Sequence, residues 1–384
     1  MIDEDKLDLR TIASIVKAAT TGGDTTQAAI PAHRLTFGTE GASWTAETAA
    51  NAAVEAMPLK AGPPPPDLPA IEAIKLALRA AVRLEFATVP PYLTALWSII
   101  DQAHPVAISI RAIAHEEMLH LSLLCNLLSA LGERPSLTGV AVPRFPGRLP
   151  GGVHPEIELR LEGYGPKALE TFLEIERPEV ALAIEGEPME TFPAEDVTIG
   201  EFYEEILQGL KRINPPLDPR RQIAGPFTWF VMTTLDDVEQ AIKLIMAQGE
   251  GAHGVPFPKY KHHLSHYYRF KSLQLLTKLE WDEGAKTLRK RGLLPTPAVF
   301  TLAPPSPEGY GPAAPLELRK ASDRFEKTYS QMLRLLEESW LEGGDKTFLR
   351  ALELMFELGP LAQTIMRIGT PDGRGYCPSF RYLP

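Results

Sequence analysis

Residues 114–128 read AHEEMLHLSLLCNLL. Its apolar residues recur at helical spacing, and the pair Glu117 and His120 stands at the head of the leucine run. Residues three apart project from the same side of a helix, so this carboxylate and imidazole face the same neighbours. A carboxylate among leucines is costly unless it is paired, protonated or bound to a metal. The stretch therefore predicts a buried helix with the Glu-x-x-His unit of four-helix-bundle di-metal proteins, and His115 and Glu116 are expected to face outward or to support the ligands.

Helical patterns surround this stretch on both sides. One begins at Pro69, and Pro90-Pro91 are expected to end or kink it, because proline lacks the N–H that continues a helix. The helix that contains Glu117 is expected over about 108–131, with Gly132 as its C-terminal cap. Further helices are predicted at about 200–211, 235–249, 261–280, 317–341 and 345–367.

The chain divides into three predicted regions. Residues 1–67 lack strong periodicity, end in AGPPPPD and are expected to form an irregular N-terminal arm. Residues 68–280 contain the helical bundle, with a Pro/Gly-rich insertion whose alternating segment 157–161 predicts a short strand. Residues 281–384 are expected to form a C-terminal helical extension packed on the bundle. The predicted fold class is mainly α, a four-helix bundle with extra helices.

Composition narrows the classes of function. The formal net charge is 39 − 49 = −10 and no basic block stands out, which argues against nucleic-acid and anionic-membrane partners. The chain has only two cysteines, which do not form a disulfide framework and fit a reducing cytoplasm. The charged N-terminus has no apolar signal-like segment, and no apolar run approaches the roughly 20 residues of a transmembrane helix. We therefore expect a cytoplasmic protein.

Three other places put carboxylates or imidazoles beside apolar helix patterns. Glu85 lies among apolar and small residues ahead of the double proline. The segment IGEFYEEIL, residues 199–207, offers Glu201, Glu204 or Glu205, and any of them could be an ordinary acid at a helix N-terminus. Glu250 stands between two glycines, so a continuous helix linking it to His253 is doubtful.

The residues alone do not decide which histidine would bind metal together with Glu250. His253 and His266 are both candidates, and the cluster around His262 and His263 allows a zinc site or a plain surface group. The order along the chain is Glu, Glu-x-x-His, Glu, then Glu with His, which is the ligand order of a ferritin-like bundle. Four carboxylates and two imidazoles suffice for two hard or borderline cations.

A family resemblance rests on motifs in a fixed order. These are LRAAVRLEFATVPPYLTALWSI (78–99), HEEMLHLSLLCNLLSALGERP (115–135), VPRFPGRLPGG (142–152), FLEIERPE (172–179), IGEFYEEI (199–206), QGEG (248–251) and SHYYRF (265–270). Together they resemble the ferritin-like domain of the iminophenylpyruvate dimer synthase type, over roughly 68–280. The resemblance implies a ferritin-like fold and metal ligands at Glu85, Glu117, His120, Glu201, Glu250 and His266. Glu201 is preferred over Glu204 as the acid of the IGEFY motif.

The function expected from these observations is a non-haem di-iron oxidoreductase. Two iron ions are the expected cofactor, with zinc or manganese as alternatives. Its partners would be a small-molecule substrate, of the amino-acid-derived imine class found in secondary metabolism, and dioxygen or peroxide. A monomer or homodimer is expected. The alternatives are a ferritin-like metal-binding protein without catalysis and a scaffold that holds no metal.

Overall fold

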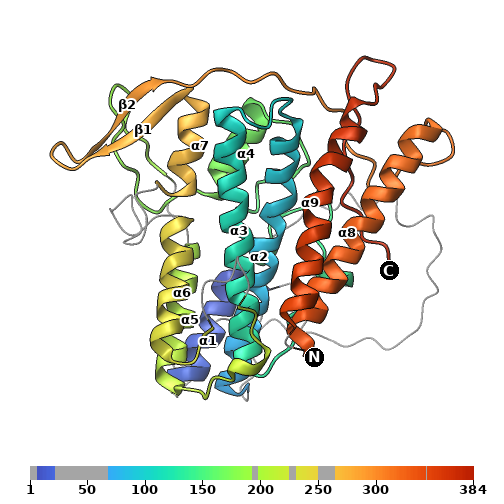
Figure 1. The fold of residues 1–384 in the computed structure, drawn as a ribbon. Helices are drawn as coiled ribbons and strands as arrows, with labels where there is room; N and C mark the ends of the chain where they lie inside the picture. The colour runs from blue at the N-terminus through green and yellow to red at the C-terminus, as the bar shows by residue number, and fades with distance from the viewer. Residues whose placement is uncertain (1–6, 22–67, 193–197, 225–230, 250–263, 343) are drawn as a thin grey trace, which may run out of the picture.

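The computed structural model describes residues 7–21, 68–192, 198–224, 231–249, 264–342 and 344–384. Its helices and strands are α1 (Leu9–Thr21), α2 (Ala70–Ser98), α3 (Pro105–Ala130), α4 (Pro166–Ile175), α5 (Ile199–Ile213), α6 (Leu235–Gln248), α7 (His266–Gln274), β1 (Thr277–Asp282), β2 (Thr287–Leu293), α8 (Leu316–Glu342) and α9 (Asp345–Arg367). Helices α2, α3, α6 and α5 form a closed bundle in which each packs against the next (Figure 1). The mainly helical fold with a four-helix bundle is confirmed.

Helix α2 runs without a break through Pro90 and Pro91. The pair was predicted to end or kink the helix, and the predicted end is therefore wrong. Each proline removes one backbone hydrogen bond, but α2 lies in the centre of the protein and its side chains from Leu84 to Ser98 are all buried. Burial of so much apolar surface outweighs the lost backbone bonds.

Helix α3 begins and ends with specific caps. The Nδ1 atom of His104 accepts a hydrogen bond from the Val106 N–H at 3.2 Å. At the other end Gly132 has φ +77°, and the Glu133 N–H reaches the Leu128 carbonyl at 2.9 Å. This left-handed C-terminal turn favours glycine, because a Cβ there is strained. The predicted long helix and its glycine cap are confirmed.

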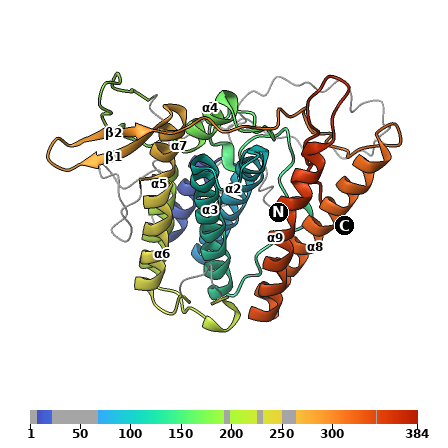
Figure 2. The ribbon, with the colours of Figure 1, turned by 45° about the horizontal axis from the view of Figure 1, so that its top comes forward.

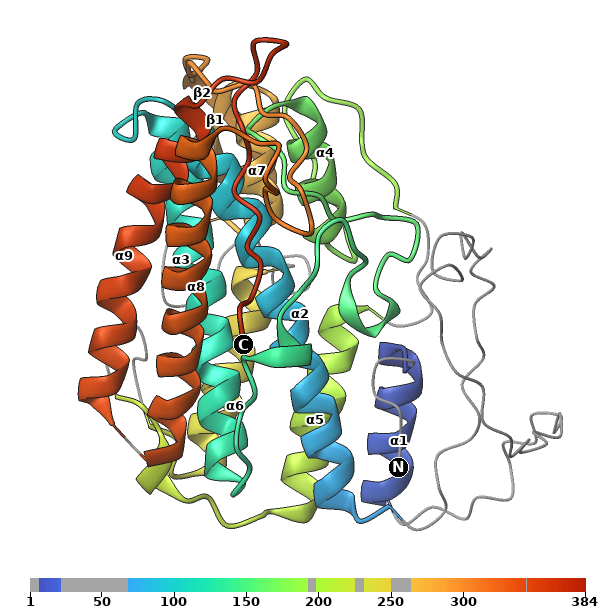
Figure 3. The same ribbon diagram turned by 90° about the vertical axis from the view of Figure 1, so that its right-hand side faces the viewer.

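The N-terminal arm contains a helix that the sequence analysis did not predict. Helix α1 buries Ile12, Ile15 and Val16 against α2 and α5 (Figure 3). Its close approach needs Gly209 on α5, because a Cβ there would lie 3.0 Å from a Val16 methyl group. The irregular arm expected over residues 1–67 is thus wrong for Leu9–Thr21, and residues 1–6 and 22–67 lie outside the described residues.

The strand prediction was placed in the wrong segment. Residues 157–161 make only an isolated bridge, in which Leu159 and Gly147 exchange both backbone hydrogen bonds. The described sheet is instead the antiparallel hairpin of β1 and β2. The helix expected over about 261–280 is shorter than predicted, since α7 ends at Gln274 and β1 follows.

Two groups of helices surround the bundle. Helix α4 packs on α2, and α7 packs on α3 and α4 (Figure 2). Helices α8 and α9 form a pair, with α9 on α2 and α8 on α3. The C-terminal segment is fixed to α8 by the buried Glu326, which accepts hydrogen bonds from Ser379 and Arg381. Within the described ranges, no helix is both long and apolar enough to cross a membrane.

Candidate metal centre

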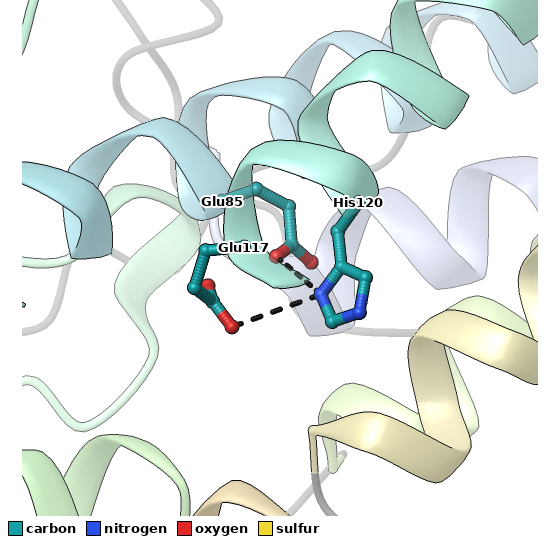
Figure 4. Close-up of side chains that lie close together, drawn as sticks. All are labelled: Glu85, Glu117 and His120. Carbon is teal, nitrogen blue, oxygen red and sulfur yellow. Dashed lines mark hydrogen bonds and ion pairs between the residues drawn. The ribbon is translucent and has the colours of Figure 1, made fainter. Parts of the chain in front are cut away.

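Three ionisable side chains from α2 and α3 meet in the middle of the bundle. Glu85, Glu117 and His120 are only 7%, 3% and 1% exposed. Figure 4 shows both carboxylates turned toward the His120 ring, whose Nδ1 lies 3.3 Å from Glu85 Oε2 and 3.7 Å from Glu117 Oε1. The donor atoms of the three residues lie within 4.8 Å of one another. They are therefore close enough to hold one cation between them.

A second group of the same kind shares Glu117. It adds Glu176, the C-terminal cap of α4, and His266, the first residue of α7. The His266 Nδ1 atom lies 2.8 Å from Glu117 Oε1 and 3.5 Å from Glu176 Oε1. The rings of His120 and His266 are 5.6 Å apart, centroid to centroid. The Glu117 carboxylate thus lies between two imidazoles, where it can bridge two ions.

The outer nitrogen of each imidazole has a polar partner. His120 Nε2 lies 2.9 Å from Gln248 Oε1, and His266 Nε2 lies 3.0 Å from Glu116 Oε2. Because both partners are acceptors, each Nε2 carries a hydrogen and each neutral ring directs its Nδ1 lone pair at the carboxylates. The His266 Nδ1 atom is buried and makes no hydrogen bond of good geometry, although Glu117 Oε1 lies 2.8 Å and Glu176 Oε1 3.5 Å from it. A lone pair facing carboxylate oxygens requires a proton or a metal ion between them.

Each of the three carboxylates also accepts a hydrogen bond from a buried hydroxyl. The pairs are Tyr203 Oη to Glu85 Oε1 at 2.5 Å, Thr88 Oγ1 to Glu117 Oε2 at 2.6 Å, and Tyr92 Oη to Glu176 Oε1 at 2.5 Å. In Glu85 and Glu117 the hydroxyl occupies one oxygen, and the other oxygen faces an imidazole. The hydroxyls therefore fix the orientation of the carboxylates toward the centre.

The charges in this cluster balance through protons when no metal is bound. Burial, followed by the charges of Glu176 and Glu85, raises the pKa of Glu117 to about 7. Burial opposes ionisation of Glu85, but the hydrogen bond and charge of His120 outweigh it and lower its pKa. Burial also opposes protonation of both imidazoles, yet the neighbouring carboxylates raise the pKa of His120 and, to a greater extent, that of His266. Metal ions bound here would displace these protons.

A cavity of about 40 Å³ lies beside Glu85, Glu117 and Glu176. Its apolar wall consists of Leu84, Ile175, Ile199, Ile245 and Met246. This volume holds a few water-sized molecules. The carboxylates therefore face a small space that is apolar on its other side.

The donor set fits a pair of metal ions. Three carboxylates and two imidazoles suit iron, manganese or zinc. Metal–ligand bonds of about 2.1 Å place neighbouring donor atoms roughly 3 Å apart. The distances of 2.8 and 3.5 Å from His266 Nδ1 to the oxygens of Glu117 and Glu176 are of this size. The described residues thus supply two half-sites that share one carboxylate.

The structure brings together Glu85, Glu117, His120 and His266 among the predicted ligands. Glu201 does not join them. It lies exposed at the start of α5, where its carboxylate accepts the Thr198 N–H at 3.0 Å in a capping box.

The remaining candidate ligands are Glu204, Glu250 and His253. Glu204, the alternative to Glu201, receives a hydrogen bond from Gln208 at 2.6 Å. Glu250 and His253 lie outside the described residues. The role of all these residues as ligands remains a prediction.

Glu176 is a site residue that was not predicted from the sequence. Its motif FLEIERPE contributed to the resemblance, but three acids in it compete and periodicity does not choose among them. One signal points to Glu176: it follows Phe172, Leu173 and Ile175, which are all buried, whereas the side chain of Glu174 is half exposed. Gln248 was also missed, since an amide gives no sign of its role from sequence.

Comparison with known proteins adds three findings. A family model described as "Ferritin-like" matches residues 78–275. Dichlorochromopyrrolate synthase of Lentzea aerocolonigenes is 26% identical over 298 residues, which cover 69% of this chain and 28% of that protein. The chain therefore matches only about a quarter of the length of this relative. A crystal structure of a ferritin-like protein from Caulobacter vibrioides superposes with a TM-score of 0.55 at 21% identity, covering 81% of this chain and 97% of the other, and shows a shared fold.

Proposed function

Because the chain belongs to the ferritin-like family, we propose that it is a non-haem di-iron oxidoreductase that acts on a small molecule. One observation carries the proposal: Glu117 is shared by two buried groups, each completed by a carboxylate and an imidazole Nδ1. Metal-free groups of this kind are costly to bury, and two cations would neutralise them. Iron is chosen over zinc because the proposed reaction is an oxidation.

The residues have distinct roles in this proposal. Glu85 and His120 would hold one ion, Glu176 and His266 would hold the other, and Glu117 would bridge them. When bound, iron supplies one-electron chemistry toward dioxygen or peroxide. The hydroxyl groups keep the carboxylates oriented, and the apolar wall of the cavity limits access of water to the reacting oxidant.

The substrate class rests on the family resemblance. We propose an amino-acid-derived imine, and the name of the Lentzea relative, a synthase, agrees with a biosynthetic role. The cavity of about 40 Å³ fits dioxygen or peroxide and is too small for an aromatic ring. An imine substrate would therefore have to react at the mouth of this cavity, or displace part of its apolar wall.

The proposal is tested by loading the chelator-treated protein with Fe²⁺ without oxygen and then adding dioxygen. Metal analysis should give two iron ions per chain, and the absorption spectrum should change when dioxygen is added. Glu176→Ala should lower the iron content to about one ion. Glu174→Ala, a neighbour on α4 with 49% side-chain exposure, is the matched control and should retain both ions. A spectrum unaffected by dioxygen would argue strongly against an oxidoreductase.

A second candidate function is metal binding without catalysis. The small cavity favours it, because the volume of about 40 Å³ beside the carboxylates is too small for an organic substrate. Such a protein would bind two ions without converting a substrate. A metal-free scaffold is the third possibility, since protons on His120, His266 and Glu117 can balance the cluster. Less than about one metal ion per chain after growth with iron would support the scaffold.

A further inference from the structure

We propose that the two ion positions differ in their affinity for metal, and that Glu116 and Gln248 cause the difference through their hydrogen bonds to His266 and His120. The position formed by Glu176 and His266 would fill first, and the position formed by Glu85 and His120 would fill second. This inference rests on the proposed function, because it assumes that both positions bind metal. It assigns positioning roles to two residues that contact neither ion.

Glu116 supports His266 with a charged oxygen. Its Oε2 atom lies 3.0 Å from His266 Nε2 and also accepts a hydrogen bond from Arg269 at 2.6 Å. The guanidinium of Arg269 forms an ion pair with the same oxygen, which holds Glu116 as a carboxylate, so the His266 N–H donates to an anion.

Gln248 supports His120 with a neutral oxygen. It is the last residue of α6, is 4% exposed, and its Oε1 atom lies 2.9 Å from His120 Nε2. The geometry of the two contacts is nearly the same, at 2.9 and 3.0 Å. The difference between the two half-sites is therefore the charge of the supporting oxygen, a carboxylate for His266 and an amide for His120.

This difference changes the donor strength of the imidazoles. A carboxylate that accepts the N–H of a ligating histidine increases electron density on the other ring nitrogen and strengthens its bond to a metal. Loss of such a partner typically weakens metal binding by about 10–100-fold. Arg269 offsets part of the Glu116 charge, but the ring N–H still contacts an anionic oxygen, whereas the amide oxygen of Gln248 carries only a partial charge.

The test is a titration of the full-length, chelator-treated chain with Co²⁺, in which binding is measured by calorimetry and by visible absorption. The wild-type protein should bind two ions in separate steps, with dissociation constants about 10–100-fold apart. Glu116→Gln should weaken the first step by about this factor and leave the second unchanged. Gln248→Glu should tighten the second step. Both substitutions keep the size of the side chain and its hydrogen-bond acceptor, and circular dichroism checks the fold.

Two further variants identify which step belongs to which position. His120→Ala should retain the tight step, and His266→Ala should retain only the weak one. Two equal steps, or steps that neither Glu116→Gln nor Gln248→Glu alters, would overturn this inference alone and leave the two-ion centre standing. No Co²⁺ binding by the wild-type protein would overturn the two-ion centre as well.

Discussion

Removing the charge of Glu117 should stabilise the metal-free protein while it abolishes the bridge between the ions. Glu117→Gln preserves the side-chain shape and an oxygen that can accept the hydrogen bond of Thr88. The ionised carboxylate is unfavourable in the metal-free fold, because burial, followed by the charges of Glu176 and Glu85, raises its pKa from 4.5 to about 7. We therefore expect the variant to be the more stable protein above pH 7.

The size and sign of this effect follow from the pKa shift. A change from 4.5 to about 7 corresponds to about 3 kcal/mol, at 1.36 kcal/mol per pH unit. The folded state of the wild type binds the Glu117 proton more tightly than the unfolded state does. The contribution of this group to the free energy of unfolding is therefore greatest below about pH 4.5 and is lost as the pH rises to about 7. Glutamine does not titrate. The variant should thus match the wild type near pH 4.5 and exceed it by about 3 kcal/mol above pH 7.

Urea unfolding in the presence of a chelator, followed by circular dichroism at several pH values from 5 to 8, measures this difference. Glu174→Gln, on the half-exposed face of α4, is the control and should change stability by less than about 0.5 kcal/mol at each pH. A Glu117→Gln variant that is less stable than the wild type at pH 8, or whose advantage does not vary with pH, would refute the reasoning. With metal added, the order should reverse, because only the wild type gains binding energy from both ions.

Three other predictions concern single contacts. Tyr92→Phe keeps the aromatic packing but removes the hydrogen bond to Glu176, and it should weaken metal binding by about 10-fold or more in the titration described above. Glu201→Ala should leave the metal content unchanged and lower the unfolding free energy by about 0.5–1 kcal/mol, because only half of the α5 capping box is lost. Cys125 and Cys377 are fully buried and burial raises the pKa of both thiols, so neither should react with a thiol reagent until urea unfolds the protein.

The helices were predictable where sequence and packing agree. The α3 pattern contains both the buried apolar face and the glycine that ends it, and each is a local property of the chain. The ends of α2 were not predictable in the same way. Proline predicts a helix end from local geometry, but Pro90 and Pro91 lie within a helix buried along its second half, where tertiary packing outweighs that preference. Helix α1 is a similar case, since its burial against α2 and α5 is a long-range contact.

The residues of the candidate site also differ in whether they could be predicted from local sequence. Spacing three apart on one helix suffices to place Glu117 and His120 on one face, so sequence alone pairs them. Glu176 and His266 reach Glu117 from other elements, and no local sequence pattern predicts the distances between these side chains. Glu201 shows the opposite case: the capping box that makes an acid favourable at a helix start also keeps it at the surface.

Local residue patterns were enough to predict the helices, a Glu-x-x-His pair on a buried face of one of them, and a ferritin-like family. These properties depend on residues close together in the chain and on motifs in a fixed order. Three features could be seen only in the folded protein: Glu117 is shared by two half-sites, Glu176 completes one of them, and a carboxylate supports one imidazole whereas an amide supports the other. Burial and mutual distance set these features, and both arise only when segments far apart in sequence pack together.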